Sequence, residues 1–247
     1  MFDCPEQKHH QFTQQAQWTQ SIRAYLTSHS QLPTHMKCLE VGCGTGAILS
    51  EWNTHSSIPV GIDINFSSLQ YAKKNVTNPM ATSDAQYLPF PSDTFHCIFT
   101  HYFFLWIKQP VEVLQEIVRC LNPGGFLFIF AEPDYGGRID YPLELSNIRE
   151  MQLQALEKDG ADPRIGGKMQ QYLHISGLEN ITGGILGCEW SGSNISNGID
   201  LENILLDAEK SGIPINKEYL QKIHKKALLE KTRISYVPTF FYSAQKV

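Results

Sequence analysis

The sequence has no apolar run long enough to cross a membrane. Its longest apolar segments, residues 102–107 and 126–131, fall far short of the ~20 residues that a spanning helix needs. The first ten residues also lack the apolar stretch of a secretory signal. These absences predict a cytoplasmic protein with no membrane partner.

Cysteine pairs and metal-ligand spacings are also missing. The 6 cysteines never form a C-x-x-C pair, and the 9 histidines show no metal-binding spacing. We therefore expect reduced, mostly buried thiols and no metal site. The sequence contains neither a G-x-S-x-G nucleophile elbow nor a phosphate-binding P-loop.

The chain has no excess of positive charge. It carries 20 Lys and Arg against 25 Asp and Glu, for a formal net charge of -5. Proteins that bind nucleic acid through bulk charge are usually basic, so we expect no nucleic-acid partner. A small molecule is the expected ligand, and the sequence does not predict an oligomeric state.

What the sequence does contain is a regular alternation in its first half. Short apolar runs alternate with amphipathic stretches, which is typical of β-α-β units and a parallel sheet. Strands are predicted at residues 38–41, 58–63, 80–82, 95–100 and 126–131. Helices are predicted at residues 11–28, 46–52, 67–76 and 111–121.

The second half is richer in helix. Helices are predicted at residues 142–158, 162–176, 201–211 and 216–232, and strands at 180–189 and 235–243. This helical material exceeds what a minimal seven-stranded domain needs. We interpret residues 1–247 as a single domain in which 142–177 and 199–232 form a helical cap over the site.

A glycine-rich loop is the sharpest signal in the sequence. The apolar run beginning at residue 38 ends at Gly42, and Gly44 and Gly46 follow before the next predicted helix. Glycines at these positions let the backbone turn tightly and approach a ligand closely. The next strand ends at Asp63, which is placed to accept hydrogen bonds from both ribose hydroxyls. The pattern predicts a nucleotide cofactor.

Two cofactor chemistries fit this loop. Gly42, Gly44 and Ala47 match the G-x-G-x-x-A spacing of a dinucleotide dehydrogenase. Glu40 favours the other reading, because a carboxylate two residues before the loop repels a pyrophosphate and suits an ammonium or sulfonium ligand.

Two further observations argue against a dehydrogenase. Asp84 follows the third strand, where it can meet an adenine amino group. The Y-x-x-x-K spacing of Tyr242 and Lys246 falls in the last strand, where a reductase's proton relay is not expected. A plain glycine-rich turn with no ligand is the structural alternative.

The residues 40–46, 61–64, 83–85 and 121–127 resemble the successive motifs of class I S-adenosylmethionine (SAM)-dependent methyltransferases. The closest likeness is to the group that acts on small molecules, and the motif-bearing part runs over residues 36–132. The resemblance implies a Rossmann-like, doubly wound, mostly parallel seven-stranded sheet whose antiparallel last strand is inserted beside the fifth. It also implies that residues 1–30 form a lid helix over the cofactor.

The resemblance assigns cofactor-binding roles to residues after each strand. Near the methionine and ribose these are Glu40, Gly42, Cys43, Gly44, Gly46 and Asp63. Near the adenine they are Ile64, Asp84, Ala85 and Gln86, and at the methionine end they are Thr100, His101 and Tyr102. His96 stands where the family usually has an aspartate.

Substrate-contacting residues are expected after the fourth and fifth strands. His101 and Tyr135 are candidate general bases, and a packing or cofactor-contacting histidine is the alternative for His101. Tyr102, Trp106, Tyr135 and Arg138 are candidate substrate contacts, with core packing or local ion pairs as the alternatives. Trp18, on the lid helix, is either a substrate contact or packed.

These observations predict methyl transfer from SAM to a small-molecule acceptor, with S-adenosylhomocysteine (SAH) as the product. Two alternatives remain. The chain could bind SAM without turnover, or it could methylate a macromolecule.

Overall fold

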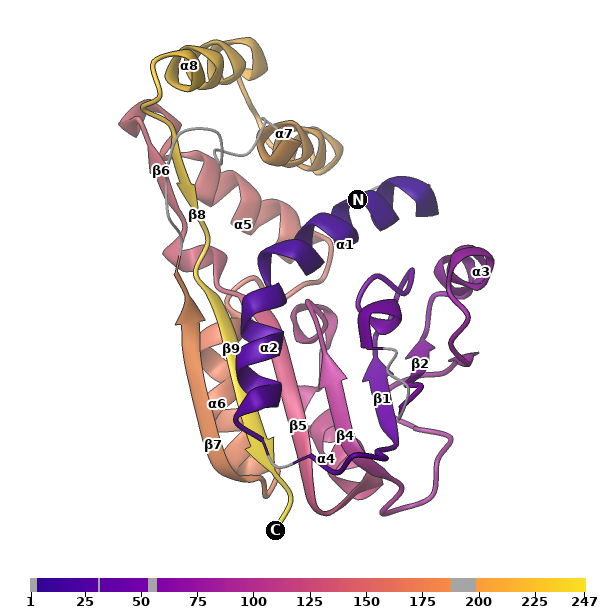
Figure 1. Ribbon diagram of the computed structural model, residues 1–247. Coiled ribbons are helices and arrows are strands. Elements are labelled where there is room, and N and C mark those ends of the chain that lie inside the picture. The colour runs from indigo at the N-terminus through magenta and orange to yellow at the C-terminus, as the bar shows by residue number, and fades with distance from the viewer. Residues whose placement is uncertain (1–3, 31, 53–56, 188–198) are drawn as a thin grey trace.

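A computed structural model describes residues 4–30, 32–52, 57–187 and 199–247 (Figure 1). A seven-stranded sheet in the order β3-β2-β1-β4-β5-β9-β7 forms its centre. Its strands are β1 Cys38–Val41, β2 Val60–Asp63, β3 Met80–Thr82, β4 Phe95–Thr100, β5 Leu121–Pro133, β7 Glu179–Leu186 and β9 Thr239–Gln245.

The first five strands run parallel, and β9 runs antiparallel between β5 and β7. On β9, Ser243 pairs with Phe128 of β5 and with Thr182 of β7. This order confirms the predicted doubly wound sheet and its inserted antiparallel strand.

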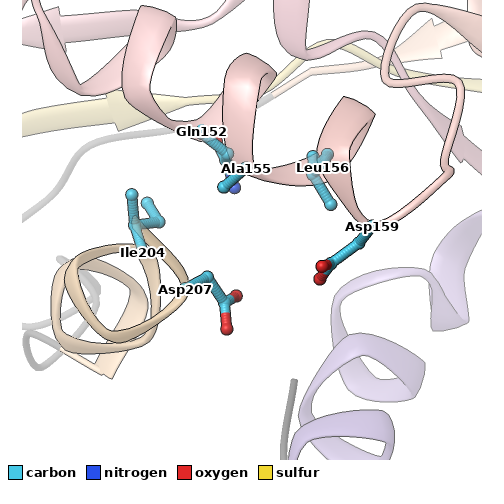
Figure 2. Close-up of a pocket in the computed structure, with 6 residues that line it drawn as sticks. All are labelled: Gln152, Ala155, Leu156, Asp159, Ile204 and Asp207. Atoms are coloured by element: carbon cyan, nitrogen blue, oxygen red, sulfur yellow. The ribbon is translucent and has the colours of Figure 1, made fainter. Parts of the chain in front are cut away.

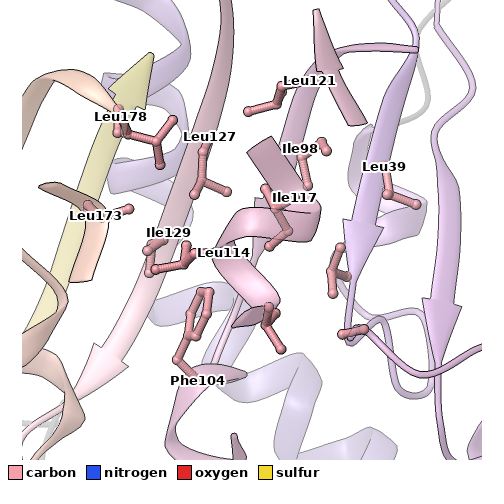
Figure 3. Close-up of a cluster of buried hydrophobic side chains, with 14 of the residues drawn as sticks. Leu39, Ile98, Phe104, Leu114, Ile117, Leu121, Leu127, Ile129, Leu173 and Leu178 are labelled. Atoms are coloured by element: carbon pink, nitrogen blue, oxygen red, sulfur yellow. The ribbon is translucent and has the colours of Figure 1, made fainter. Parts of the chain in front are cut away.

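The two faces of the sheet form two apolar cores. Alternate side chains of β4 and β5 point to opposite faces, as the pleat requires. Ile98, Leu127 and Ile129 pack against α4 Pro110–Cys120 and α6 Ile165–Ile175 (Figure 3). On the other face, Phe99, Phe128 and Phe130 belong to a cluster with Ala16, Leu26 and the half-buried Trp52. The helix α3 Phe66–Asn75 packs beside β2 and β3.

The N-terminal segment differs from the single helix predicted at residues 11–28. It forms α1 Pro5–Trp18 and α2 Gln20–Ser28, which are separated at Thr19. The Thr19 hydroxyl contacts the carbonyl groups of Gln15 at 3.0 Å and Ala16 at 3.2 Å. Such bonding back to the preceding turn competes with helix continuation.

The helix predicted at 46–52 is also shorter than expected. Only a 3-10 turn, η1 Leu49–Trp52, forms there. Gly46 has a φ of 78°, in the left-handed region, so a right-handed helix cannot include it.

The cap consists of α5 Ile148–Lys158, α7 Ile199–Lys210 and α8 Lys217–Leu229, which share an apolar core of their own. A two-stranded ribbon of β6 Ile139–Tyr141 and β8 Ile234–Tyr236 connects it to the sheet. Figure 1 shows the cap and α1 at the edge of the sheet where β1 and β4 end.

Three boundaries in the second half correct the sequence analysis. The first cap helix begins at Ile148, because Pro142 is extended and a short turn, η4 Leu143–Leu145, follows it. The strand predicted at 235–243 is divided into β8 and β9 around Pro238, which has no N–H to donate to a ladder. The helix α6 lies against β5, β7 and β9. It therefore covers the sheet, and only the first part of the predicted cap element 142–177 belongs to the cap. The predicted strand 180–189 is β7, and its last two residues lie outside the described part.

Candidate cofactor and substrate site

The candidate site lies at the carboxyl ends of the parallel strands. Glu40 is near the end of β1, Asp63 ends β2 and Thr100 ends β4. Open α/β sheets place their ligands at this edge. The structure therefore brings together three segments that the sequence analysis assigned to one cofactor.

The glycine loop has little room for side chains. Gly42 has a φ of 78°, and a Cβ built there would lie 2.4 Å from the Phe103 ring. A Cβ at Gly44 would lie 3.1 Å from the Phe12 ring of α1. The loop is anchored beneath, where the N–H groups of Gly42 and Cys43 both donate to the Ile62 carbonyl at 2.9 Å. The glycines therefore let the rings of Phe103 and Phe12 lie directly against the backbone of the loop.

Asp63 holds this loop through its carboxylate. Its Oδ2 accepts from Gly44 N at 2.7 Å and its Oδ1 accepts from Asn65 N at 2.7 Å. Burial raises the pKa of Asp63, and the two backbone donors oppose this rise. Each carboxylate oxygen has two lone pairs, so Asp63 keeps acceptor capacity for ribose hydroxyls.

Glu40 is buried with an unsatisfied oxygen. Its side chain is 2% exposed, and its Oε2 has no hydrogen-bond partner among the described residues. Burial, followed by the nearby charge of Asp63, raises the pKa of Glu40 well above its usual value. An unpaired buried carboxyl oxygen costs stability unless a donor or cation satisfies it. Thr100 Oγ1, at the end of β4, is likewise unpartnered within the described part.

The predicted adenine edge exposes apolar and polar groups together. Ile64 is 70% exposed, and Asp84 is exposed with its Oδ1 accepting from Gln86 N at 2.9 Å. Ala85 is buried beneath them, and Gln86 donates to Gln109 Oε1 at 2.7 Å. The Ser83 N–H donates to the Asp63 carbonyl at 3.1 Å and so joins the two loops.

Two exposed aromatic residues at this edge were not singled out from the sequence. Phe66 follows Asp63 by three residues, and Tyr87 follows Asp84 by three residues. Their position three residues after each acidic residue is the sequence signal that could have placed them at the adenine edge.

The helix α1 contacts the glycine loop directly. His9 Nδ1 lies 3.0 Å from Thr45 Oγ1, and the His9 ring lies 5.3 Å from that of Tyr71 on α3. The sequence analysis assigned His9 no role, so this contact with the glycine loop is a finding of the structure. Trp18 is exposed at the end of α1, so its side chain is not part of the core.

His101 is partly buried and bonded to the N-terminal helices. Its Nε2 lies 2.9 Å from Thr19 Oγ1. Burial, together with the charge of Arg23, lowers the pKa of His101 to about 3. A general base near neutral pH needs a pKa close to the working pH and a free nitrogen aimed at the substrate. This geometry argues against the general-base interpretation of His101.

The loop after β4 carries two of the candidate substrate contacts. Tyr102 has a φ of 50° and donates its N–H to Ala131 O at 2.8 Å. Trp106 ends the turn η2 Phe104–Trp106 and is partly exposed. Tyr135 lies in the next turn, η3 Tyr135–Gly137, partly buried against the main core. The structure does not bring these three side chains into one described contact.

Glu132 positions the loop that follows β4. Its Oε1 accepts from Phe103 N at 2.9 Å and Phe104 N at 2.8 Å, and its Oε2 accepts from Leu105 N at 3.2 Å. Burial raises the pKa of Glu132 to about 7, against the effect of these three donors. The sequence analysis did not assign Glu132 a role, because its partners lie 27 to 29 residues away.

Arg138 does not face a substrate site. Its guanidinium is buried, with Nε 2.6 Å from Asp140 Oδ2 and Nη1 2.8 Å from Gln152 Oε1. Arg233 Nη2 lies 2.6 Å from the other oxygen of Asp140. These contacts connect the ribbon to α5, so the ion-pair alternative describes Arg138 better than the substrate-contact interpretation.

His96, the departure from the family pattern, has a structural role. Its Nδ1 accepts from the Lys37 N–H at 3.0 Å, just before β1. The position therefore supports the loop that leads into the glycine motif.

A hollow between α5 and α7 lies apart from the glycine loop. Figure 2 shows the six residues that line it: Gln152, Ala155, Leu156, Asp159, Ile204 and Asp207. All of them belong to the cap or to the turn after α5. Within the described ranges no group of three or more His, Cys, Asp or Glu is arranged to hold a metal ion. No described helix is long and apolar enough to cross a membrane.

Comparisons with known proteins match this geometry. Residues 39–129 match the family model described as a methyltransferase domain, which covers less than half of the chain. The sterol 4-C-methyltransferase strm-1 of Caenorhabditis elegans is 23% identical over 117 residues, 44% of this chain and 35% of that protein. The mitochondrial arginine-hydroxylase NDUFAF5 of Danio rerio is 27% identical over 147 residues, 59% of this chain and 43% of that protein.

A solved structure of a SAM-dependent methyltransferase from Archaeoglobus fulgidus has the same fold. Its TM-score is 0.58 at 17% identity, and the match covers 94% of each chain. The sheet order, the glycine loop with its carboxylates and the family match identify residues 39–129 as a class I methyltransferase domain. This family implies SAM as the cofactor. The chain spans less than half the length of the two relatives described above.

Proposed function

We propose that this protein transfers a methyl group from SAM to a small-molecule acceptor. The buried Glu40 carboxyl, unpartnered at Oε2 just before the glycine loop, is the observation that carries the proposal. In its ionised form this group would repel a dinucleotide pyrophosphate, whereas a ligand with an ammonium or sulfonium charge would pair with it and favour that ionised form. This favours SAM over a nicotinamide cofactor.

We assign described residues to each part of SAM. Glu40 would hold the ammonium, and Thr100 would offer its free hydroxyl to the methionine end. Asp63 would accept the ribose hydroxyls, Ile64 would pack on the adenine and Asp84 would accept from the adenine amino group. Bound SAM supplies a methyl group that is activated by the sulfonium charge.

The protein's contribution to the reaction would be alignment. Direct displacement at the methyl carbon needs the acceptor in line with the leaving sulfur, and holding two reactants in that geometry can be worth several kcal/mol. The loop fixed by Glu132 carries Tyr102 and Trp106 toward the same edge, and α1 and the cap lie over it (Figure 1). We infer an enclosed acceptor, which favours a small molecule over a macromolecule.

The relatives do not agree on an acceptor. One is described as a sterol methyltransferase and the other as an arginine hydroxylase. An acceptor with a resting lone pair needs no base. A hydroxyl or carbon acceptor needs one, and Tyr135 is then our candidate because His101 is neutral and bonded to Thr19. Kinetics of Tyr135→Phe with a true substrate would test this role, and an unchanged rate would contradict it.

Calorimetric titration tests the cofactor assignment. SAH should bind with micromolar affinity, and NADH should not bind. Asp63→Ala should weaken the binding of SAH at least about tenfold, because it removes an acceptor for charged and hydroxyl groups. Preference for NADH, or no binding of SAH, would overturn the proposal.

Binding without turnover is a second candidate function. The observation that favours it is the lowered pKa of His101, whose Nε2 is bonded to Thr19, because this removes the most obvious base. Transfer of a labelled methyl group into a metabolite extract would distinguish the two functions. Labelled product supports the enzyme, and SAH binding with no labelled product supports the binding protein.

A further inference from the structure

Glu132 is a fully buried carboxyl group near the end of β5. Its oxygens accept from three consecutive backbone N–H groups, those of Phe103 at 2.9 Å, Phe104 at 2.8 Å and Leu105 at 3.2 Å. Among the described residues it forms no salt bridge, so these three donors offset the cost of burying it. The carboxyl group of Glu132 therefore binds the backbone of the loop that follows β4.

This loop is held by two consecutive residues of β5. Tyr102 has a φ of 50°, a left-handed conformation that is unfavourable for a residue with a Cβ. Its N–H donates to the carbonyl of Ala131 at 2.8 Å, and Ala131 directly precedes Glu132. An unfavourable backbone conformation persists where the surrounding contacts fix it. The contacts from Ala131 and Glu132 supply that constraint.

Phe103 connects this loop to the glycine loop. Its N–H binds Glu132, and its ring is partly buried at the edge of the main core. A Cβ built on Gly42 would lie 2.4 Å from Cδ2 and 3.2 Å from Cγ of Phe103, so the ring rests directly on the glycine backbone. Gly42 begins the glycine loop, two residues after Glu40. Glu132 therefore holds the backbone of a residue whose ring contacts the loop assigned to the methionine end of the cofactor.

We propose that Glu132 is a positioning residue for methyl transfer: it holds residues 103–105 so that Phe103 fixes the loop after β4 against Gly42. This inference rests on the proposed function. Residues 100–102, assigned to the methionine end of SAM, and Trp106, a candidate acceptor contact, lie on either side of the three bonded residues. One carboxyl group that touches neither reactant would thus set the two halves of the site relative to each other, and alignment of this kind is what the reaction needs.

Titration with two ligands separates this role from general stabilisation. SAH carries the methionine-derived part, whereas 5′-methylthioadenosine has the adenosine part without the amino acid. Glu132→Gln should weaken SAH binding about tenfold, as expected for loss of one hydrogen bond to a charged group at the methionine end, and should change 5′-methylthioadenosine binding less than about twofold. Equal losses for both ligands, or an unchanged affinity for SAH, would overturn the proposal.

Glu116→Gln is the matched control for this titration. The Glu116 carboxylate lies on α4 and also accepts from a backbone N–H, that of Leu88, at 2.8 Å. Leu88 follows the loop assigned to the adenine, which both ligands contain. Glu116→Gln should therefore change the two affinities by the same factor, and a selective loss of SAH binding in this variant would overturn the proposal.

Phe103→Leu tests the same step without altering the buried carboxyl group. It should weaken SAH binding selectively, and the double variant with Glu132→Gln should bind SAH no more than about twofold more weakly than the weaker single variant, because both changes act on one contact. Phe90→Leu is the control, since Phe90 packs on the same core but beside Phe95, at the other end of β4. It should leave the SAH affinity unchanged. Additive losses in the double variant would overturn the proposal.

Hydrogen exchange of single amides shows directly what Glu132 holds. In Glu132→Gln the amides of residues 103–105 should exchange at least about tenfold faster than in the wild type, whereas those of residues 127–129 in β5 should keep their protection. Equal acceleration in both segments would show a general loosening of the fold and would overturn the proposal. Failure of the wild type to bind SAH would instead contradict the proposed function.

Discussion

The Thr19 hydroxyl lies 2.9 Å from His101 Nε2, so the break between α1 and α2 is joined to the residue that follows β4. Arg23 Nη1 donates to the same hydroxyl at 2.6 Å. A residue that the sequence suggested as a base therefore holds the N-terminal helices against the sheet. These contacts join the α1 helix, which lies over the glycine loop, to the end of β4.

The stability of the fold should depend on pH through His101. The pKa of His101 is about 3 in the folded chain, whereas an unfolded histidine titrates near 6.5. The unfolded state therefore binds an extra proton between these values, and stability should fall as pH drops from about 6.5 toward 3. His101→Gln should lose this component, which amounts to about 5 kcal/mol at most. Urea unfolding at several pH values gives the free energy of unfolding as a function of pH. The same pH dependence in the variant and the wild type would contradict this prediction.

Glu132 should contribute a pH dependence of opposite sign. Its folded pKa of about 7 lies above the usual carboxyl value, so its contribution is complete at low pH and is lost as pH rises from about 4.5 to 7. Glu132→Gln should remove this loss but cost about 1–3 kcal/mol, because an amide nitrogen cannot accept from a backbone N–H. Unfolding curves at pH 5 and pH 7 would show both effects. The His101→Gln variant, which keeps Glu132, isolates this effect. A gain in its stability between pH 5 and pH 7 would contradict the assignment.

Gly42 and Gly124 allow a matched test of crowding at the glycine loop. Both have a φ near 80°, but a Cβ at Gly42 would meet Phe103 at 2.4 Å, whereas one at Gly124 would meet nothing within 4 Å. Gly124→Ala should cost about 1–2 kcal/mol for the left-handed backbone alone. Gly42→Ala should cost about 1–3 kcal/mol more, because Phe103 must shift. Urea unfolding of both variants measures the difference, and equal losses would show that Phe103 moves aside freely.

Asp140 should be essential to the ribbon that carries the cap. It forms ion pairs with both Arg138 and Arg233, and all three side chains are buried. Asp140→Asn should destabilise the protein by about 3–5 kcal/mol, because two buried guanidinium groups would lose their counter-charge. Glu157→Gln, which breaks the exposed pair with Arg164, is the control and should cost no more than about 1 kcal/mol. Similar urea midpoints for both variants would contradict this prediction.

The sequence predicted those features whose signals are local. The strands around the glycine loop were predicted because apolar runs, glycines and acids follow one another within a few residues, from Cys38 to Asp63. The antiparallel last strand followed from the resemblance to a family. The candidate cofactor-binding residues lie at one edge of the sheet because they follow strands that run parallel. Their contacts with the ligand are predictions.

The features that the sequence did not predict depend on distant partners. Arg138 looked like a substrate contact because its neighbours are polar, but Ser235, to which it also donates, is 97 positions away. Thr19 interrupts a helix that the periodicity predicted as continuous, and its partner His101 is 82 positions away. Burial turned both polar residues into structural ones, and burial of this kind cannot be read from local composition.

The strand β9 lies between β5 and β7 and pairs with both. Lys246 fixes its end, with Nζ 2.7 Å from Asp93 Oδ1 and 2.8 Å from the Leu121 carbonyl. During synthesis, β7 has no partner strand in the sheet until residues 239–245 have left the ribosome. The sheet is therefore completed only after translation of this segment, and premature termination before it would leave two exposed strand edges that favour aggregation.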